Sequence, residues 1–148
     1  MLYTVGEMAK LLDVAPSTLR YYDKEGLLPF VERSEGGVRL FRESDYGTLK
    51  IIECLKTTGM QLKDIKQFIY LAMQGDSTIE ERLALFRRQR VEVEKQMAKL
   101  GEALDSVKFK CWFYETAQKA GTTDVPTNMS DEELPEAFRE VRTRLKKI

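Results

Sequence analysis

The 148-residue chain contains no histidine, only two cysteines and no net charge. Without histidine it lacks the commonest general base and metal ligand of proteins. Cys54 and Cys111 are too few for a disulfide scaffold, and they lack the spacing of zinc ligands. A glycine-rich cofactor loop is also missing, so nothing in the sequence indicates thiol catalysis or a nucleotide cofactor. We therefore expect no metal, no cofactor and no enzymatic activity.

The chain also lacks a secretory signal and any apolar run long enough to span a bilayer, so we expect a cytoplasmic protein with no membrane partner. Charges balance within each half: residues 1–74 hold ten basic and ten acidic side chains, and residues 75–148 hold fourteen of each. This balance does not favour a nucleic-acid partner. DNA binding would have to depend on locally placed arginines and on two copies acting together.

The first pattern that is present is a pair of short helices joined by a tight turn. Thr4 and Glu7 have the spacing of a capping box, which predicts a helix start. Residues 13–15 form a turn, and Pro16 suits the first turn of a second helix. Gly26 suits the left-handed residue that ends it. The combination indicates a helix-turn-helix.

The second helix divides its side chains between two faces. Leu19 and Tyr22 are three residues apart and can pack inward together. The residues left on other faces are Ser17, Thr18, Arg20 and Tyr21. Hydroxyls at a helix start, beside a guanidinium and a phenol, suit contacts to phosphates and base edges in a major groove. Taken alone, the same residues would also suit an ordinary surface helix.

A β-hairpin is predicted next, because alternating residues at 30–33 and 38–42 flank Gly36-Gly37. Arg33, Arg39 and Arg42 project from its two arms. The arginines favour a wing that contacts the DNA backbone, and the alternative is a hairpin that only caps the small core. Ser44 then caps a third helix, and residues 61–74 form a fourth. Residues 1–75 are thus expected to be one DNA-binding unit.

Residues 78–120 show the period of a coiled-coil helix, with apolar positions three and four residues apart over more than four heptads. The stripe includes Leu83, Phe86, Val93, Met97, Leu100, Leu104, Val107 and Tyr114. From Leu83 to Tyr114 such a helix spans roughly 47 Å. The small first unit cannot cover it, so we expect a second copy as the partner. The alternative is a helix folded across its own domain.

Residues 121–148 are predicted to be a polar linker that contains Pro126, followed by an amphipathic helix. Ser130 and Glu133 have the spacing of a second capping box. The apolar stripe after it consists of Leu134, Phe138, Val141 and Leu145. We expect this helix to dock on the coil or on the first unit.

This order of elements resembles the MerR family of bacterial transcription regulators, and residues 1–74 are similar to its DNA-binding domain. The resemblance lies in the runs Tyr3–Ala9, Thr18–Leu27, Gly37–Phe41 and Thr58–Ile65, with Leu-Arg-Tyr-Tyr at 19–22 the most specific. It implies a mostly α fold: a winged helix-turn-helix domain, a long antiparallel coiled-coil dimerisation helix and a short C-terminal helix.

The resemblance also implies a function. Such regulators are homodimers that bind palindromic promoter DNA, and an inducer changes how they distort it, so that RNA polymerase can engage both promoter elements. Carried over to this chain, the DNA contacts would come from the second helix and the wing. They would be Ser17, Thr18, Arg20, Tyr21, Arg33 and Arg39.

The signal that such a protein senses is less evident. Metal-sensing branches of the family carry cysteines where this chain has Ser77–Ile79 and 121–123, so a cysteine-based metal site is not expected. Drug-sensing branches carry a large C-terminal domain, and the segment after Ala120 is too short for one. Cys54 lies off the apolar face of the third helix, one turn from the ammonium of Lys50, which would favour a thiolate.

The position of Cys54 looks like that of the sensing cysteine in the thiol-based, aldehyde-responsive NmlR- and AdhR-like branch. We therefore expect an electrophile or oxidant to modify Cys54. The alternatives remain open: Cys54 fills a seam between the third helix and the coil, or Trp112, Phe113 and Tyr114 bind a small apolar ligand with the tail helix. Cys111 is interpreted as a packing residue, although a bridge to Cys54 of a second copy is conceivable.

Overall fold

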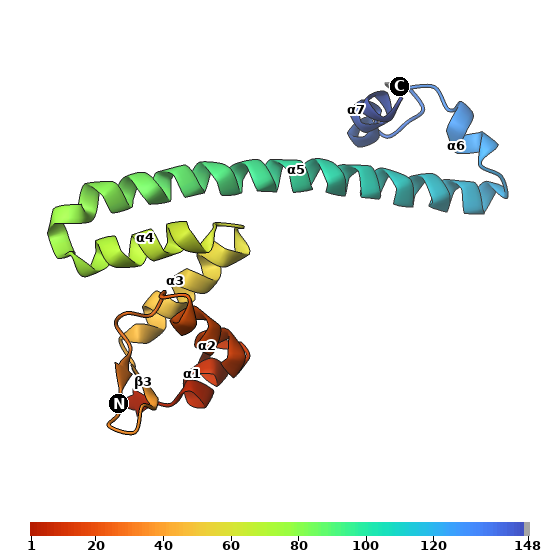
Figure 1. The fold of residues 1–148 in the computed structure, drawn as a ribbon. Helices are drawn as coiled ribbons and strands as arrows, with labels where there is room; N and C mark the ends of the chain where they lie inside the picture. The colour runs from red at the N-terminus through yellow and green to blue at the C-terminus, as the bar shows by residue number, and fades with distance from the viewer. Residues whose placement is uncertain (147–148) are drawn as a thin grey trace. The chain divides into compact units, whose positions relative to one another are not determined.

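The computed structural model describes residues 1–146 as a mostly helical chain that divides into two compact units, Met1–Arg90 and Val91 onward (Figure 1). The last two residues of the predicted tail segment, 147–148, lie outside the described residues. The elements in order are β1 Leu2–Tyr3, α1 Val5–Leu12, α2 Pro16–Lys24, β2 Glu32–Arg33, β3 Arg39–Arg42, α3 Asp45–Thr57, α4 Leu62–Met73, a 3₁₀ turn Gly75–Thr78, α5 Ile79–Ala120, α6 Asp124–Asn128 and α7 Glu136–Leu145. Among the helices of residues 1–146, none combines the length and hydrophobicity that a bilayer crossing requires.

The predicted helix-turn-helix is confirmed in its details. Thr4 and Glu7 form the reciprocal capping box at the start of α1, and these bonds to Thr4 lower the pKa of the Glu7 carboxyl. Pro16 occupies the first turn of α2. Gly26 follows α2 with φ of 78°, in the left-handed region, and a Cβ there would lie 2.9 Å from the Lys66 ammonium. The positive φ therefore favours glycine at this exit, whereas the Lys66 side chain is flexible and could move aside.

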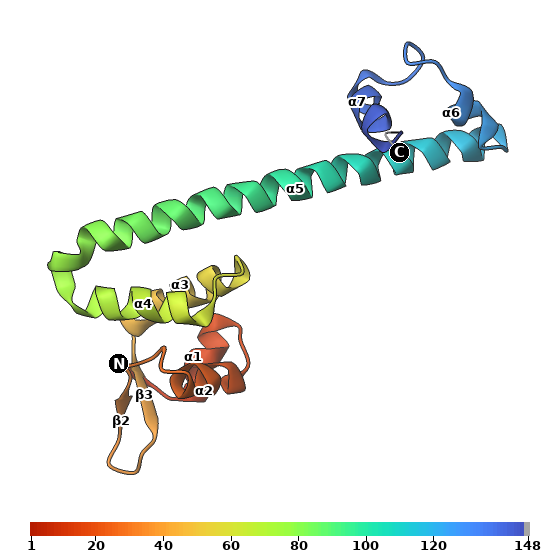
Figure 2. The same cartoon turned by 45° about the horizontal axis from the view of Figure 1, so that its top comes forward.

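The wing is a hairpin with an additional strand that the sequence did not predict. The sheet order is β1-β3-β2, all antiparallel, with Arg33 opposite Arg39 and Tyr3 opposite Phe41. Figure 2 shows the turn between β2 and β3 projecting away from the helices. β1 has only two residues, and so short a strand carries no alternating pattern. Its pairing ties the start of the chain to the base of the wing.

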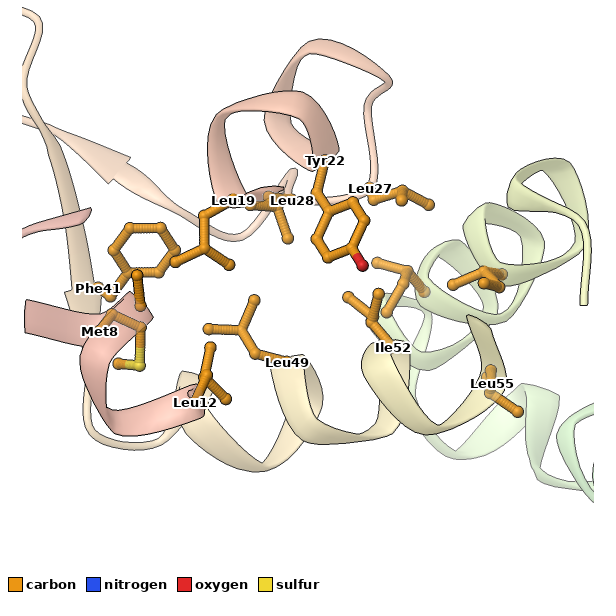
Figure 3. Close-up of a cluster of buried hydrophobic side chains, with 13 residues drawn as sticks. Met8, Leu12, Leu19, Tyr22, Leu27, Leu28, Phe41, Leu49, Ile52 and Leu55 are labelled. Carbon is orange, nitrogen blue, oxygen red and sulfur yellow. The ribbon is translucent and has the colours of Figure 1, made fainter. Parts of the chain in front are cut away.

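One core holds the first unit together. Side chains from α1, α2, β3, α3 and α4 converge in it (Figure 3). Its most buried large members are Met8, Leu19, Tyr22, Leu27, Phe41, Leu49, Ile52, Ile65 and Ile69. The inward pairing of Leu19 with Tyr22 is thus confirmed, and it fixes the rotation of α2 about its axis.

The start of α3 differs from the predicted cap. Ser44 holds the N-cap position, but within the described residues its side chain makes no capping hydrogen bond. Asp45 instead accepts a hydrogen bond from the Arg42 backbone N–H at 2.7 Å. The helix start is thereby linked to the end of β3. At the other end of the unit, Phe86 of α5 packs edge-to-face on Phe68 of α4, with ring centroids 5.0 Å apart.

The second unit joins the end of α5 to the tail. α7 docks on α5 as expected, through an aromatic and aliphatic cluster. Its members are Phe109, Trp112, Phe113, Met129, Leu134, Phe138 and Val141. Leu145, the fourth residue of the predicted stripe, is exposed.

Two expectations for the tail are wrong. The segment predicted as a polar linker contains the short helix α6, in which Pro126 is buried. The capping-box bonds between Ser130 and Glu133 do form, but they close a turn, and α7 begins only at Glu136. Pro135 explains the delay, because the residue before a proline is disfavoured in the helical conformation.

A buried arginine closes this turn onto α7. Arg142 donates to the Met129 carbonyl at 2.7 Å and pairs with the carboxylate of Asp131. The hydrogen bond and charge of Arg142 lower the pKa of the Asp131 carboxyl. The tail is therefore fixed by a polar clamp in addition to its aromatic cluster.

Candidate nucleic-acid interface

The outward face of α2 is the best candidate for a nucleic-acid interface in the first unit. Ser17, Arg20 and Tyr21 are exposed, and Thr18 is half-buried. Leu19 and Tyr22 anchor the opposite face in the core. The helix thus presents two hydroxyls, a guanidinium and a phenol to solvent from a firmly held backbone, which suits contact with phosphates and base edges.

The buried side of α2 is joined to α3 by a hydrogen bond and a cation. The Tyr22 hydroxyl donates to the carboxylate of Glu53. The Lys56 ammonium lies 5.0 Å from the Tyr22 ring centroid and 5.7 Å from that of Tyr21, so one lysine of α3 approaches both rings of α2. Burial, and then the bond to Glu53, raise the pKa of Tyr22. The phenol therefore stays neutral and acts as a donor.

The wing arginines meet α2 at one carboxylate. Arg39 Nε donates to Asp23 Oδ2 at 2.6 Å, and Arg33 Nη2 donates to the same oxygen at 2.7 Å. Arg33 and Arg39 face each other across the β2–β3 pair. Asp23 is close to the C-terminal end of α2, where the helix dipole disfavours an acidic side chain. Two guanidinium groups compensate for that position.

A second ion pair lies on the hairpin itself. Arg42 of β3 pairs with Glu32 of β2, and both side chains are largely exposed. This pair joins the two arms of the wing without involving α2. It offers a matched comparison for the Asp23 cluster, because it also pairs a carboxylate with an arginine of the same hairpin.

The predicted coil residues are mostly exposed in the single chain. In the first unit Leu83 is exposed, whereas Phe86 contributes to the core through Phe68. In the second unit Val93 is half-buried. The exposed members there are Met97, Leu100, Leu104, Val107 and Tyr114, with Leu100 at 72% exposure. Large apolar side chains this exposed mark an interaction surface.

Both cysteines are exposed, and each lies near one of these features. Cys54 follows Glu53 on α3. Lys50, one turn earlier, has its ammonium 3.5 Å from the Leu12 carbonyl and 5.8 Å from the Tyr46 ring centroid. Cys111 lines a shallow apolar surface with Val107 and Tyr114 at the end of α5.

The three aromatic residues considered for a ligand site have different surroundings. Trp112 and Phe113 pack on Phe109 in the tail cluster. Tyr114 is exposed on the apolar surface beside Cys111. A cavity of about 290 Å³ lies between α5 and the tail, and of the three only Phe113 lines it. It is at the small end of the range for ligand pockets. Residues 1–146 contain no cluster of three side chains of the kinds that hold a metal ion.

Sequence reasoning found the outward residues of α2 and the wing arginines but missed the side chains that connect them. Asp23, Glu53 and Lys56 were not proposed as site residues. For Asp23 a signal was available: an acidic side chain in the last turn of a helix needs a compensating cation. For Glu53 and Lys56 none was available, because their partners lie on another helix.

Comparison with known proteins agrees with this architecture. Residues 3–71 match the family described as MerR HTH family regulatory protein, and residues 47–108 match the family described as MerR, DNA binding. An HTH-type transcriptional regulator of Haemophilus influenzae is 47% identical over 122 residues, covering 82% of this chain and 90% of that one.

Two solved structures are similar over most of the chain. HiNmlR, described as a MerR family regulator lacking the sensor domain and bound to promoter DNA, superimposes with a TM-score of 0.80 at 44% identity. The match covers 91% of this chain and 100% of HiNmlR. A MerR family transcriptional regulator of Bacillus thuringiensis gives a TM-score of 0.71 at 43% identity, covering 75% of this chain and 97% of the other.

Proposed function

The chain belongs to the MerR HTH family of regulatory proteins and is a DNA-binding transcription regulator, not an enzyme; from this we propose that it acts as a homodimer that distorts promoter DNA and is switched at Cys54. HiNmlR, its similar structural neighbour, is described as bound to promoter DNA. The corresponding partners of this chain are double-stranded promoter DNA, a second copy and RNA polymerase at the promoter.

DNA binding is supported most directly by the ion pairs through which Asp23 joins α2 to the wing. Asp23 belongs to α2, the helix that also carries Arg20 and Tyr21, and its carboxylate holds Arg33 and Arg39 within 2.7 Å. Arginines at that place reach phosphates on either side of a major groove occupied by α2. The DNA contacts proposed are Ser17, Thr18, Arg20, Tyr21, Arg33 and Arg39.

The exposed apolar residues of α5 support the homodimer. We assign residues 1–75 to DNA binding, 78–120 to dimerisation and 121–148 to a linker and C-terminal helix, and the described part of this tail packs on α5. A second copy with its long helix antiparallel would cover Leu100, Leu104 and Val107. The two DNA-binding units would then bind one palindromic site together. This paired binding would compensate for the weak electrostatic attraction between DNA and a chain with zero net charge. Distortion of the DNA between them would set how RNA polymerase engages the promoter.

Cys54 is the proposed sensor because its thiol is exposed and because its neighbours Glu53 and Lys56 contact side chains of α2. Glu53 accepts the Tyr22 hydrogen bond, and Lys56 lies over Tyr21 and Tyr22. Modification of the exposed thiol by an aldehyde or other electrophile would act on the helix that orients the DNA-reading face. Lys50, one turn earlier on α3, is the second residue of the proposed sensor site.

DNA binding is tested by fluorescence anisotropy on a duplex that the protein selects from random DNA. Arg20→Ala should weaken binding about 5- to 150-fold if its guanidinium contacts a base. Lys95→Ala removes the same charge from α5 and should leave the affinity within about two-fold. Equal affinities for wild type and Arg20→Ala would contradict the assignment of α2.

Thiol sensing is tested by mass spectrometry and a reporter promoter after formaldehyde treatment. Wild type should carry an adduct on Cys54 and change transcription, whereas Cys54→Ser should bind DNA normally and not respond. Cys111→Ser is the matched control and should respond as wild type does. A full response from Cys54→Ser would remove Cys54 as the sensor without affecting the DNA-binding proposal.

A further inference from the structure

We propose that Asp23 is a positioning residue that determines DNA selectivity by fixing both wing arginines against α2. The proposal rests on the proposed DNA-binding function and concerns a residue that makes no DNA contact of its own. Asp23 would thereby hold α2 and the wing together as one rigid DNA-binding surface.

Asp23 is placed so that it can hold both wing arginines. Its Oδ2 accepts from Arg39 Nε and Arg33 Nη2, at 2.6 and 2.7 Å. The Asp23 side chain is 15% exposed and that of Arg39 24%, so this pair is screened less than the fully solvated pairs of a protein surface. Arg33, at 54%, reaches the same oxygen from the other arm. One oxygen therefore links α2, β2 and β3.

The bonds to Asp23 leave the arginines able to bind phosphate. A guanidinium has five N–H donors in a fixed plane. Arg39 uses Nε, which leaves the two terminal nitrogens with four donors, and Arg33 uses one terminal nitrogen. A carboxylate on one edge can therefore orient each guanidinium while its other edge points to DNA.

The charge of Asp23 works against affinity, and this makes the proposal testable. An acidic side chain between two arginines reduces the cluster from two positive charges to one, and it repels the phosphate backbone. If repulsion were its entire effect, removing it would strengthen binding to every duplex equally. If it positions the arginines, removing it weakens binding to the selected duplex relative to others.

The experiment measures the affinity ratio between a duplex selected by the wild-type protein and a scrambled duplex of equal length, over a series of salt concentrations. Asp23→Asn should lower this ratio at least about ten-fold while steepening the salt dependence on scrambled DNA by up to about one unit. Glu32→Gln, the matched control, removes the same charge from the Arg42 pair. It should leave the ratio within about two-fold.

Asp23→Glu separates position from charge and also decides the matter if Asp23→Asn fails to fold. It keeps the charge but moves the carboxylate outward by one methylene, and positioning predicts a ratio lowered at least about three-fold. An unchanged ratio in Asp23→Glu, or equal strengthening on both duplexes in Asp23→Asn, would overturn the proposal. A wild-type protein that selects no duplex would instead contradict the proposed function itself.

Discussion

The hydroxyl of Tyr22 on α2 donates a hydrogen bond to the carboxylate of Glu53, the residue that precedes Cys54 on α3. Tyr22 is 1% exposed, and its ring packs among the core residues of the first unit. The same α2 carries Arg20 and Tyr21 on its outer face. The proposed DNA-reading face and the proposed sensor are thus separated by one buried side chain and one hydrogen bond.

Removing that hydrogen bond should destabilise the first unit. Tyr22→Phe keeps the ring in place but leaves the Glu53 carboxylate without its phenol donor. Because Glu53 is half-buried and can recruit water, we expect a loss of about 1 kcal/mol in the free energy of unfolding, measured with urea. Tyr21→Phe, on the exposed side of the same helix, should change it by less than about 0.5 kcal/mol. Similar losses for both variants would refute a specific role for the bond.

The raised pKa of Tyr22 gives the stability a pH dependence in alkali. Below the unfolded pKa, near about 10, both states hold the proton and the contribution of Tyr22 is fully present. As the pH rises towards the higher folded pKa, only the unfolded state loses its proton, so stability declines.

Absorbance of tyrosinate at 295 nm measures this directly. The chain has six tyrosines, and one should ionise only at a pH well above 10, or together with unfolding. In Tyr22→Phe this late step should be missing and the alkaline loss of stability should be smaller. A late step that persists in the variant would assign it to a different tyrosine.

The second unit should depend on the residues that α7 buries. Leu134 is 2% exposed and packs in the tail cluster, so Leu134→Ala should cost about 2–5 kcal/mol through the cavity it leaves. Trp112, the only tryptophan of the chain, lies in that cluster and reports the transition by fluorescence. Leu145→Ala, where the side chain is 43% exposed, is the control and should cost under about 1 kcal/mol.

The proposed dimerisation through α5 should fail when a charge replaces an exposed apolar residue. Leu100 is 72% exposed, so Leu100→Glu should not unfold the single chain. In the dimer each carboxylate would be buried, and the dissociation constant should rise more than about 30-fold, as measured by analytical ultracentrifugation. Lys95→Glu, on the opposite face by helical spacing, should have little effect. A dimer unaffected by Leu100→Glu would place the interface elsewhere.

Much of the first unit could be predicted because its local signals agree with its packing. The spacing of Leu19 and Tyr22, the Thr4 capping box and the glycine exit at Gly26 each gave the correct element. These features are set within a few residues of one another. The outward face of α2 followed from them directly.

The remaining features depend on residues far apart in the chain or on competing local signals. β1 exists only because Leu2 and Tyr3 meet β3. The capping box at Ser130 was a true signal, but Pro135 delayed the helix. Phe86 fits the coil spacing yet packs on Phe68 of α4, a partner that lies outside the local helical pattern. The partners of Asp23, Arg33 and Arg39, come within hydrogen-bond distance of it only when the wing folds beside α2.

The central claim, that two copies of this chain read DNA through α2 and the wing, is tested most directly by selecting duplexes from a random pool and sequencing them. We predict an enriched inverted repeat, bound by two chains per duplex, that Arg20→Ala no longer enriches. Enrichment of a single unrepeated motif bound by one chain, or no enrichment at all by the wild-type protein, would contradict it.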